Sequence, residues 1–269
     1  YERTGRKLEG IQMVVASDMR EDVGMGISAA ITVATAVACN ILGTNPLDDA
    51  TLVKLCHRVE NQFMSLKGDH FSPYAVKFAK KDQLVLFDAR SFKPEYMPFD
   101  SQNYKLVTVD SGARKKEREE EFKKRLELFG QLLAEIRKYI PKVISLRDVG
   151  GEAYETARKN LDIILRKRLD HVVYENQRVK RAKDILVKGD YEGFGRLLSE
   201  SHDSLADKLK ATCQEVDILT NVVRAQPGCL GSRMMGIGWG GSVVCLVKAA
   251  ETAAFVDRVR GEYKKQVNI

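Results

Sequence analysis

One stretch near the start of the chain constrains its fold more than any other, because a β-branched run, a glycine-bearing turn and a long apolar segment follow one another there. The run Ile11–Ala16 predicts a short strand, since side chains branched at Cβ favour extended backbone. The segment Ile31–Leu42 predicts a helix that stops at Gly43. A strand that leads through a glycine turn into a helix indicates mixed α/β architecture.

The turn itself, which contains Gly24, Gly26 and Ser28, is a candidate anion site. The first N–H groups of a helix have no intrahelical acceptor, and the helix dipole adds partial positive charge there. The two glycines would let the backbone approach a phosphate closely, and the Ser28 hydroxyl could bind a phosphate or magnesium. A tight turn into a core helix explains the same residues equally well, so both interpretations stay open.

Hydrophobic periodicity predicts more helix than strand in the rest of the chain. The predicted strands are Leu84–Asp88, Lys105–Asp110 and Val243–Val247. The predicted helices are one through Leu52–Phe63 with Asp48 or Asp49 as its cap, one that starts at Ser72 and Pro73, and those at 114–139, 152–187, 191–199, 215–224 and 249–263. Pro94 and Pro98 mark a boundary near residue 100, which gives predicted domains 1–100 and 101–269.

Composition narrows the classes of function. Hydrophobic residues make up 44% and charged residues 30%, which is ordinary for a globular protein, and no run approaches the roughly 18 apolar residues of a membrane span. The net charge is +7, but acidic residues are interleaved with the basic ones, which argues against a nucleic-acid partner. Five scattered cysteines without a C-x-x-C pair predict a reducing, cytoplasmic setting, and four of them are predicted to be core residues. The four histidines show no metal-ligand spacing.

Residues 16–30, A-S-D-M-R-E-D-V-G-M-G-I-S-A-A, resemble the second motif of the GHMP sugar kinases in its galactokinase form, S-D-V-P-x-G-x-G-L-S-S-S-A-A. The resemblance implies ATP as the ligand of Gly24, Gly26 and Ser28, with magnesium at Ser28. It also shows departures, because two of the motif's serines are lost and Glu21 and Asp22 flank the loop. A like charge about 6 Å from a phosphate costs roughly 3 kcal/mol before salt screening, so nucleotide binding is expected to be weak or lost.

The resemblance also identifies the position of the general base. The segment Gly68–Val76 is similar to the family's C-G-I-M-D-Q-Y-A-S, whose aspartate takes the proton of the sugar hydroxyl, and Ser72 stands at that aspartate's position. Serine is a poor base near neutral pH, and Ser72 before Pro73 is also a good helix N-cap. Asp69 is the candidate substitute base, and His70 is a weaker one.

Further motifs extend the resemblance from about residue 11 to residue 263. They are Leu55–Phe63 (A-E-N-x-F in the family), Val107–Gly112 (V-x-x-D-S-G), Lys167–Val179 (K-R-A-x-H-V-x-x-E-x-x-R-V), Glu200–Leu205 (E-S-H-x-S-L), Cys213 with Asp217 (C-P-E-L-D) and Gly231–Ser242 (G-A-R-M-T-G-A-G-x-G-G-C). The last implies nucleotide contacts at Gly236, Gly238 and Gly240. Substrate contacts are implied at Asp110 and at Arg125, which remains of the pattern Y-N-x-R-R-x-E-C. From the residues alone, the glycines permit close approach to a ligand or to another loop. Packing is the expected role of Trp239, and helix packing and capping are the expected roles of His171 and His202.

The resemblance implies a GHMP kinase fold, α/β followed by α+β. It would have a ribosomal-S5-like N-terminal part and a ferredoxin-like C-terminal part. The N-terminal part is expected to be incomplete, because the family's first motif, R-x-N-L-x-G-E-H-T-D, would lie upstream of Tyr1. The parent reaction is ATP-dependent phosphorylation of galactose at its anomeric hydroxyl. Three hypotheses remain: a catalytically impaired member (a pseudoenzyme) that binds a ligand or an unknown protein partner, an active sugar kinase with a substitute base such as Asp69, and a fragment without independent function.

Overall fold

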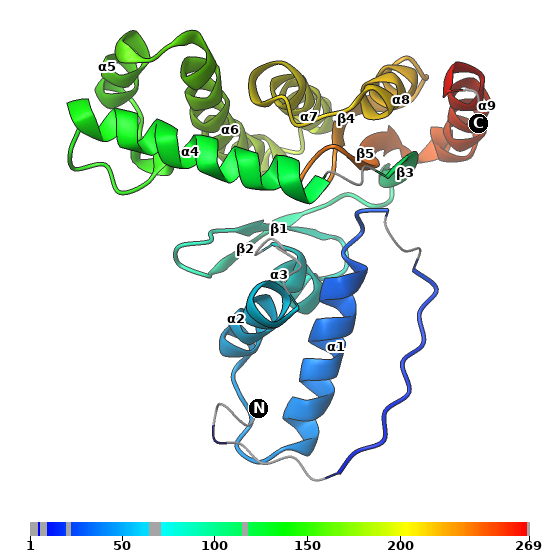
Figure 1. The fold of residues 1–269 in the computed structure, drawn as a ribbon. Helices are drawn as coiled ribbons and strands as arrows, with labels where there is room; N and C mark the ends of the chain where they lie inside the picture. The colour runs from blue at the N-terminus through cyan, green and yellow to red at the C-terminus, as the bar shows by residue number, and fades with distance from the viewer. Residues whose placement is uncertain (1–4, 6–9, 20–22, 65–70, 115–117, 268–269) are drawn as a thin grey trace. The chain divides into compact units, whose positions relative to one another are not determined.

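The computed structural model describes residues 5, 10–19, 23–64, 71–114 and 118–267 of the 269-residue chain. The chain divides into two compact units, Tyr1–Phe99 and Asp100–Ile269 (Figure 1). Each unit has buried hydrophobic residues of its own, and each is described separately below. None of the described helices is both long enough and apolar enough to span a membrane.

The helices described in the first unit are α1 (Ile27–Leu42), α2 (Asp49–Arg58) and α3 (Phe71–Phe78). Helix α1 starts earlier than predicted, directly after Gly26. Of the two candidate caps for the next helix, Asp48 is the one observed, because its carboxylate accepts the backbone N–H of Thr51 at 3.0 Å and the Thr51 hydroxyl at 2.6 Å. Side chains from all three helices are buried together, namely Ala29, Val33, Leu52, Val53, Cys56 and Tyr74.

Strand β1 (Gln83–Phe87) pairs antiparallel with β2 (Pro94–Pro98), in a register that sets Gln83 opposite Pro98. The prediction of a strand at Leu84–Asp88 is therefore confirmed to within one residue. Strand β2 was not predicted, since proline lacks the N–H that a strand needs for its ladder. Phe87 of this hairpin is part of an aromatic cluster, and the centroid of its ring lies 3.8 Å from that of Tyr74.

The strand predicted at Ile11–Ala16 is wrong. Residues 10–19 form no regular secondary structure, and none of the described strands pairs with them. Val14 is 95% exposed. Branched side chains favour extended backbone, but a strand also needs a neighbour that satisfies its N–H and C=O groups, and the sequence pattern carries no information about that neighbour.

The second unit contains an antiparallel sheet in the order β3–β5–β4, made of β3 (Tyr104–Arg114), β4 (Cys229–Met234) and β5 (Gly240–Lys248). Strand β5 is central and almost entirely buried. Strand β4 was not predicted, because C-L-G-S-R-M has few residues that favour strands. It is held by α7 (Tyr191–Ser204), whose Gly195 meets Gly231 so closely that a Cβ on Gly231 would lie 1.8 Å from the Gly195 carbonyl oxygen.

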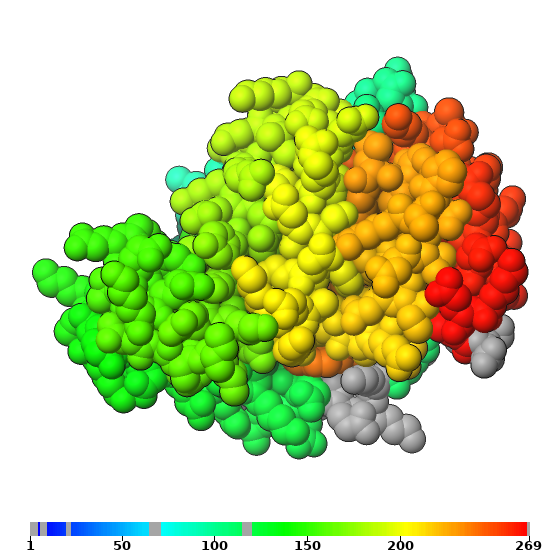
Figure 2. Space-filling model, turned by 90° about the horizontal axis from the view of Figure 1, so that it is seen from above, coloured from blue at the N-terminus to red at the C-terminus, as the bar shows by residue number. Residues whose placement is uncertain are grey.

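The other helices of this unit are α4 (Arg118–Tyr139), α5 (Glu152–Asn160), α6 (Ile163–Val187), α8 (Gln214–Arg224) and α9 (Thr252–Val267). The prediction of one helix over 152–187 is wrong, because α5 ends at Asn160 and a new helix, α6, begins at Ile163. Asp162 is the new N-cap and accepts the N–H groups of Ile164 and Leu165 at 2.8 and 3.0 Å. Helix α6 packs beside α7, and α8 packs beside α9. Figure 2 shows these four helices on one face of this unit.

Two clusters form the core of the second unit. One lies between the sheet and helices α8 and α9, and the other lies among α4, α5 and α6. The cysteine prediction is wrong by one residue, since Cys56, Cys213 and Cys245 are buried whereas Cys39 and Cys229 are half-buried.

Candidate functional site

The candidate phosphate loop of the first unit enters α1 through two glycines in the left-handed region, Gly24 at φ +74° and Gly26 at φ +75°. The Gly26 carbonyl accepts the Ala30 N–H at 2.9 Å, so the N–H groups of Ile27 and Ser28 come too early in the helix to have an intrahelical acceptor. No acidic residue occupies the first turn of α1. This helix start therefore has the geometry and the sign of charge that suit a phosphate.

Ser28 is joined to a carboxylate from another element. Its hydroxyl donates a 2.7 Å hydrogen bond to Oε1 of Glu60, which is 3% exposed. Glu60 lies in a π-helical turn, Val59–Phe63, that continues directly from α2. Turns of this kind are rare and often occur at functional sites. Glu60 is not among the site residues predicted from the sequence, although the stretch similar to A-E-N-x-F contains it.

Ser72 lies beside the same loop. A Cβ built on Gly26 would come 3.6 Å from Cβ and 3.7 Å from Oγ of Ser72, which is ordinary contact. The predicted N-cap role of Ser72 is wrong, because α3 already begins at Phe71, whose ring packs edge-on against Phe87 at 5.7 Å. Pro73 is tolerated in this first turn, where N–H groups need no intrahelical acceptor.

Several predicted loop and base residues lie outside the described part of the chain. These are Glu21 and Asp22, which were expected to flank the phosphate loop, and Asp69 and His70, the candidate substitute bases. The structure therefore brings together Gly26, Ser28 and Ser72 among the predicted residues and adds Glu60 to them.

The second glycine loop, in the second unit, joins β4 to β5. Gly236, Gly238 and Gly240 all have positive φ, at +71°, +119° and +137°. A Cβ on Gly238 would lie 2.6 Å from the Ala211 carbonyl oxygen, and one on Gly240 would lie 2.8 Å from that of Ala113. Of the two alternatives that the sequence left open, close approach to another loop describes Gly238, whereas Gly240 closely approaches strand β3.

Arg125 supports this loop from α4. Its Nη1 donates to the Ile237 carbonyl at 2.8 Å, and its guanidinium lies 5.0 Å from the Phe122 ring centroid and 4.8 Å from that of Trp239. Burial lowers the pKa of Arg125 to about 10, so it stays charged near neutral pH. Trp239 is 6% exposed, and its backbone N–H donates to the Ala211 carbonyl at 2.7 Å, which agrees with the expected packing role.

Asp110, the other predicted substrate contact, is paired within β3. Its two carboxylate oxygens accept hydrogen bonds from Nη1 and Nη2 of Arg114 at 2.9 and 2.6 Å. The register of the β3–β5 ladder shifts between these two residues. One oxygen also accepts the Gly112 N–H at 3.0 Å. Structural partners thus hold Asp110 and Arg125 in place, and sugar contacts at these residues stay predictions.

The two histidines of the second unit are buried and neutral. His171 Nδ1 lies 2.9 Å from Ser204 Oγ, and His202 Nδ1 accepts the Met234 N–H at 3.3 Å. Burial lowers the pKa of each histidine to about 4. Beside them, burial acts to raise the pKa of Glu175, but hydrogen bonding from Ser201 together with Arg233 and Arg178 outweighs it and lowers that pKa.

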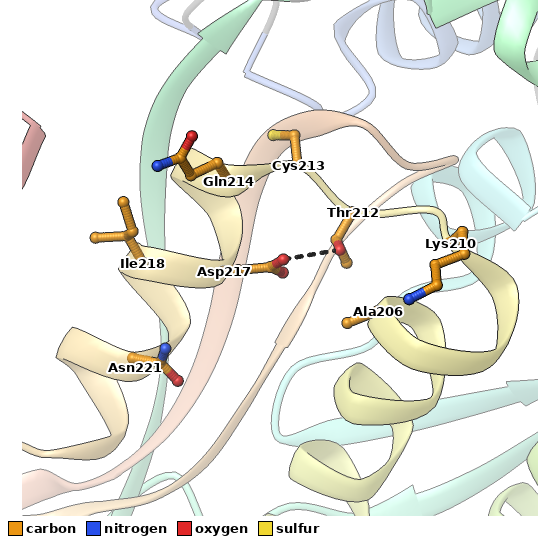
Figure 3. Close-up of a pocket in the computed structure, with 8 residues that line it drawn as sticks. All are labelled: Ala206, Lys210, Thr212, Cys213, Gln214, Asp217, Ile218 and Asn221. Carbon is orange, nitrogen blue, oxygen red and sulfur yellow. Dashed lines mark hydrogen bonds between the residues drawn. The ribbon is translucent and has the colours of Figure 1, made fainter.

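An open pocket of about 440 Å³ lies where α8 begins (Figure 3). It is lined by Ala206, Lys210, Thr212, Cys213, Gln214, Asp217, Ile218 and Asn221. The Thr212 hydroxyl donates to Oδ2 of Asp217 at 3.1 Å, and the other oxygen of Asp217 faces His202 Nε2 at 3.5 Å. Ala211 lies between the lining residues Lys210 and Thr212, and it is the residue that Gly238 and Trp239 contact. The segment that lines the pocket therefore also supports the second glycine loop.

The residues of the first unit fit a magnesium-bound phosphate. Magnesium takes oxygen ligands, commonly one or two carboxylates together with phosphate oxygens and water, and Ser28 with Glu60 supplies a hydroxyl and a buried carboxylate. In the described part of the chain, no three His, Cys, Asp or Glu residues gather as a metal site. The protein would therefore share the ion with a phosphate ligand, as the adjoining helix start allows.

Comparison with known proteins gives consistent matches. Residues 1–76 match the model of the GHMP kinases N terminal domain, and residues 182–265 match that of the GHMP kinases C terminal domain. The chain is 31% identical over 269 residues to a galactokinase of Thermotoga petrophila, which covers all of this chain and 74% of that protein. It is 31% identical over 263 residues to a galactokinase of Clostridium tetani, with 97% of this chain and 67% of that protein covered.

Solved structures agree. The fold superposes on Lactococcus lactis galactokinase complexed with galactose with a TM-score of 0.86 at 27% identity, over 94% of this chain and 65% of that chain. Mevalonate kinase of L. major has a TM-score of 0.56 at 20% identity, which shows a shared fold alone. The matches to the two GHMP kinase domain families define a GHMP kinase fold. The two glycine loops and the contact of Ser28 with Glu60 agree with this fold. Among the proteins with this fold, the chain belongs to the galactokinase family.

Proposed function

We propose that the chain binds magnesium and the phosphates of ATP at the start of α1. The observation that carries this proposal is the 2.7 Å contact of Ser28 with the buried Glu60, next to the left-handed Gly26. In this proposal Ser28 and Glu60 hold the ion, and the first N–H groups of α1 bind phosphate oxygens. A bound magnesium ion would neutralise phosphate charge, which is the main electrostatic requirement of phosphoryl transfer.

The proposed parent reaction is phosphorylation of galactose at the anomeric hydroxyl by ATP, supported by the galactokinases that resemble the chain. We propose further that this reaction is impaired and that the chain acts, in a cytoplasmic setting, by binding a ligand or a protein partner. Ser72 next to Gly26 supports this, because a serine hydroxyl cannot hold the proton of a sugar hydroxyl near neutral pH. Loss of a positioned base typically costs 10²- to 10⁴-fold in rate.

Calorimetric titration of the purified chain with Mg·ATP, and then with galactose, tests the binding proposal. Glu60→Gln is expected to weaken Mg·ATP binding about tenfold or more, since about 1.4 kcal/mol of metal binding corresponds to that factor. Glu135→Gln is a matched control, because Glu135 is in α4 and pairs with Lys138. Equal Mg·ATP affinity in the Glu60→Gln and Glu135→Gln variants, or no Mg·ATP binding by the unaltered chain, would contradict the proposal.

The alternative is an active sugar kinase with Asp69 as its base. A turnover assay with galactose and ATP separates it from the impaired form. Activity that Asp69→Asn abolishes while Mg·ATP affinity is kept would favour the alternative. Mg·ATP binding without turnover would favour the impaired form.

A further inference from the structure

The β4–β5 hairpin carries two cysteines on one face of the sheet. Cys229 is directly opposite Val247 in the antiparallel register, and Cys245 precedes Val247 by two residues on the same strand. Side chains two apart on a strand point to the same face, and directly opposite residues share a face. Cys229 and Cys245 are therefore diagonal neighbours, and both pack against the core between the sheet and helices α8 and α9.

The two thiols differ in exposure and in acidity. Cys245 is 0% exposed, whereas Cys229 is half-buried. A hydrogen bond from the Cys245 thiol lowers the pKa of Cys229, the charge of Arg224 acts in the same direction, and burial opposes both. The same hydrogen bond, together with burial, raises the pKa of Cys245. A partly exposed thiol of lowered pKa beside a second cysteine is the usual arrangement of a peroxide-sensitive pair.

We propose that Cys229 and Cys245 are a site of reversible oxidation by hydrogen peroxide, with Cys229 as the reacting and Cys245 as the resolving cysteine. The Cys229 sulfur attacks one peroxide oxygen, so an S–O bond forms, the O–O bond breaks and one water leaves. The Cys245 sulfur then attacks the oxidised sulfur, so the S–S bond forms, the S–O bond breaks and a second water carries away the Cys245 proton. Two thiols are oxidised by two electrons in total, and one hydrogen peroxide is reduced to two waters. A dithiol reductant reverses the step.

The disulfide would close a ring that contains the rest of the hairpin. Residues 230–244 lie between the two cysteines, and they include the loop of Gly236 and Gly238. Oxidation would therefore tie β4 to β5 on the far side of the hairpin from its turn. This inference does not depend on the proposed nucleotide site, which lies in the other unit.

Peptide mapping of the full-length chain tests the proposal without an activity assay. The reduced chain is treated with a small excess of hydrogen peroxide, the remaining thiols are alkylated, and trypsin is added. Cleavage after Arg224, Arg233 and Lys248 places Cys229 in peptide 225–233 and Cys245 in peptide 234–248. The expected result is a cross-link between these two peptides that dithiothreitol releases, with three of the five thiols still open to alkylation after denaturation.

Two variants sharpen the test. Cys229→Ser is expected to lose the cross-link, and the matched control Cys39→Ser, another half-buried cysteine, is expected to keep it. The emission of Trp239 verifies that the second unit of Cys229→Ser is folded, and far-UV circular dichroism verifies the fold of Cys39→Ser, whose substitution lies in the first unit. The unaltered chain gives the cross-link result in any case. The proposal is overturned if all five thiols survive, if Cys39 oxidises as fast as Cys229, or if Cys229 pairs with another cysteine.

Discussion

Gly238 illustrates how single positions in this chain are constrained by backbone geometry. Its φ of +119° is a conformation that side chains rarely adopt, and a Cβ there would meet the Ala211 carbonyl oxygen at 2.6 Å. Gly261 in α9 contrasts with it, because a Cβ there has no heavy atom within 4 Å. The sequence shows both as glycines, and only the structure separates the required one from the replaceable one.

We therefore expect opposite effects from the same substitution at these positions. Gly238→Ala is expected to lower the free energy of unfolding by about 1–3 kcal/mol, because of strain at a positive φ and the close carbonyl. Gly261→Ala is expected to raise it by about 0.5–1 kcal/mol, since alanine loses less entropy in a helix. Urea denaturation followed by far-UV circular dichroism measures both. A Gly238→Ala variant as stable as the parent would refute the steric argument.

Some individual site residues can be predicted from the sequence, and others cannot. Gly26 and Ser28 were found from the loop pattern, because a glycine before a helix start has a local cause. Glu60 was missed, since its importance comes from contact with Ser28, 32 positions away in the sequence. Ser72 was assigned a cap role, but it lies inside α3, which already includes Phe71. The ring contact of Phe71 with Phe87, 16 positions away, is likewise a feature that only the fold provides.

Elements were predicted well where their signals are local. Asp48 as a cap, the strand at Leu84–Asp88 and the strand Val243–Val247 within β5 all follow from caps or periodicity. Elements that depend on a distant partner were not predictable. Strand β4 exists because β5 pairs with it and α7 contacts it through glycine, and the run Ile11–Ala16 lacks a described partner strand.

The break between α5 and α6 gives a prediction at this scale. Asp162 accepts two N–H groups of the first turn of α6, so Asp162→Ala is expected to cost about 1 kcal/mol of unfolding free energy. Asp162→Asn keeps an acceptor oxygen and is expected to cost much less. Thermal and urea unfolding of the two variants provide the comparison. Equal losses in both would mean that the charge of Asp162, and not its cap bond, stabilises the helix start.

For the whole molecule, the buried neutral histidines predict how stability depends on pH. His171 and His202 both lie in the second unit, with folded pKa values of about 4, below the ordinary value of about 6.5. Between these pH values the unfolded chain binds more protons than the folded chain, so stability is lost as the pH falls from about 6.5 toward 4. The lowered pKa of Glu175 changes the stability only at pH values near or below the ordinary pKa of a carboxyl group. It therefore contributes little over most of the range from about pH 6.5 to about pH 4.

We expect each histidine to cost about 2 kcal/mol of unfolding free energy between about pH 7.5 and about pH 5. Trp239 is the single tryptophan and is buried in the second unit, so its emission in urea titrations follows that unit. His202→Asn keeps an acceptor for the Met234 N–H without a titrating ring, and should remove about half of the pH dependence. An unchanged slope in this variant would show that His202 is not part of the effect.

The π-helical turn at Val59–Phe63 has an evolutionary consequence. Its bond from the Met64 N–H to the Val59 carbonyl spans five residues, whereas an α-helix spans four, so this turn holds one residue more than a regular helix would. Each residue of an α-helix rotates the chain by about 100°. Deletion of a single codon just after Glu60 would restore a regular helix and turn the following segment through about that angle, without changing any residue of the site itself. Relatives with one residue fewer here would therefore be expected to present the residues that follow Glu60 in this turn in a different direction.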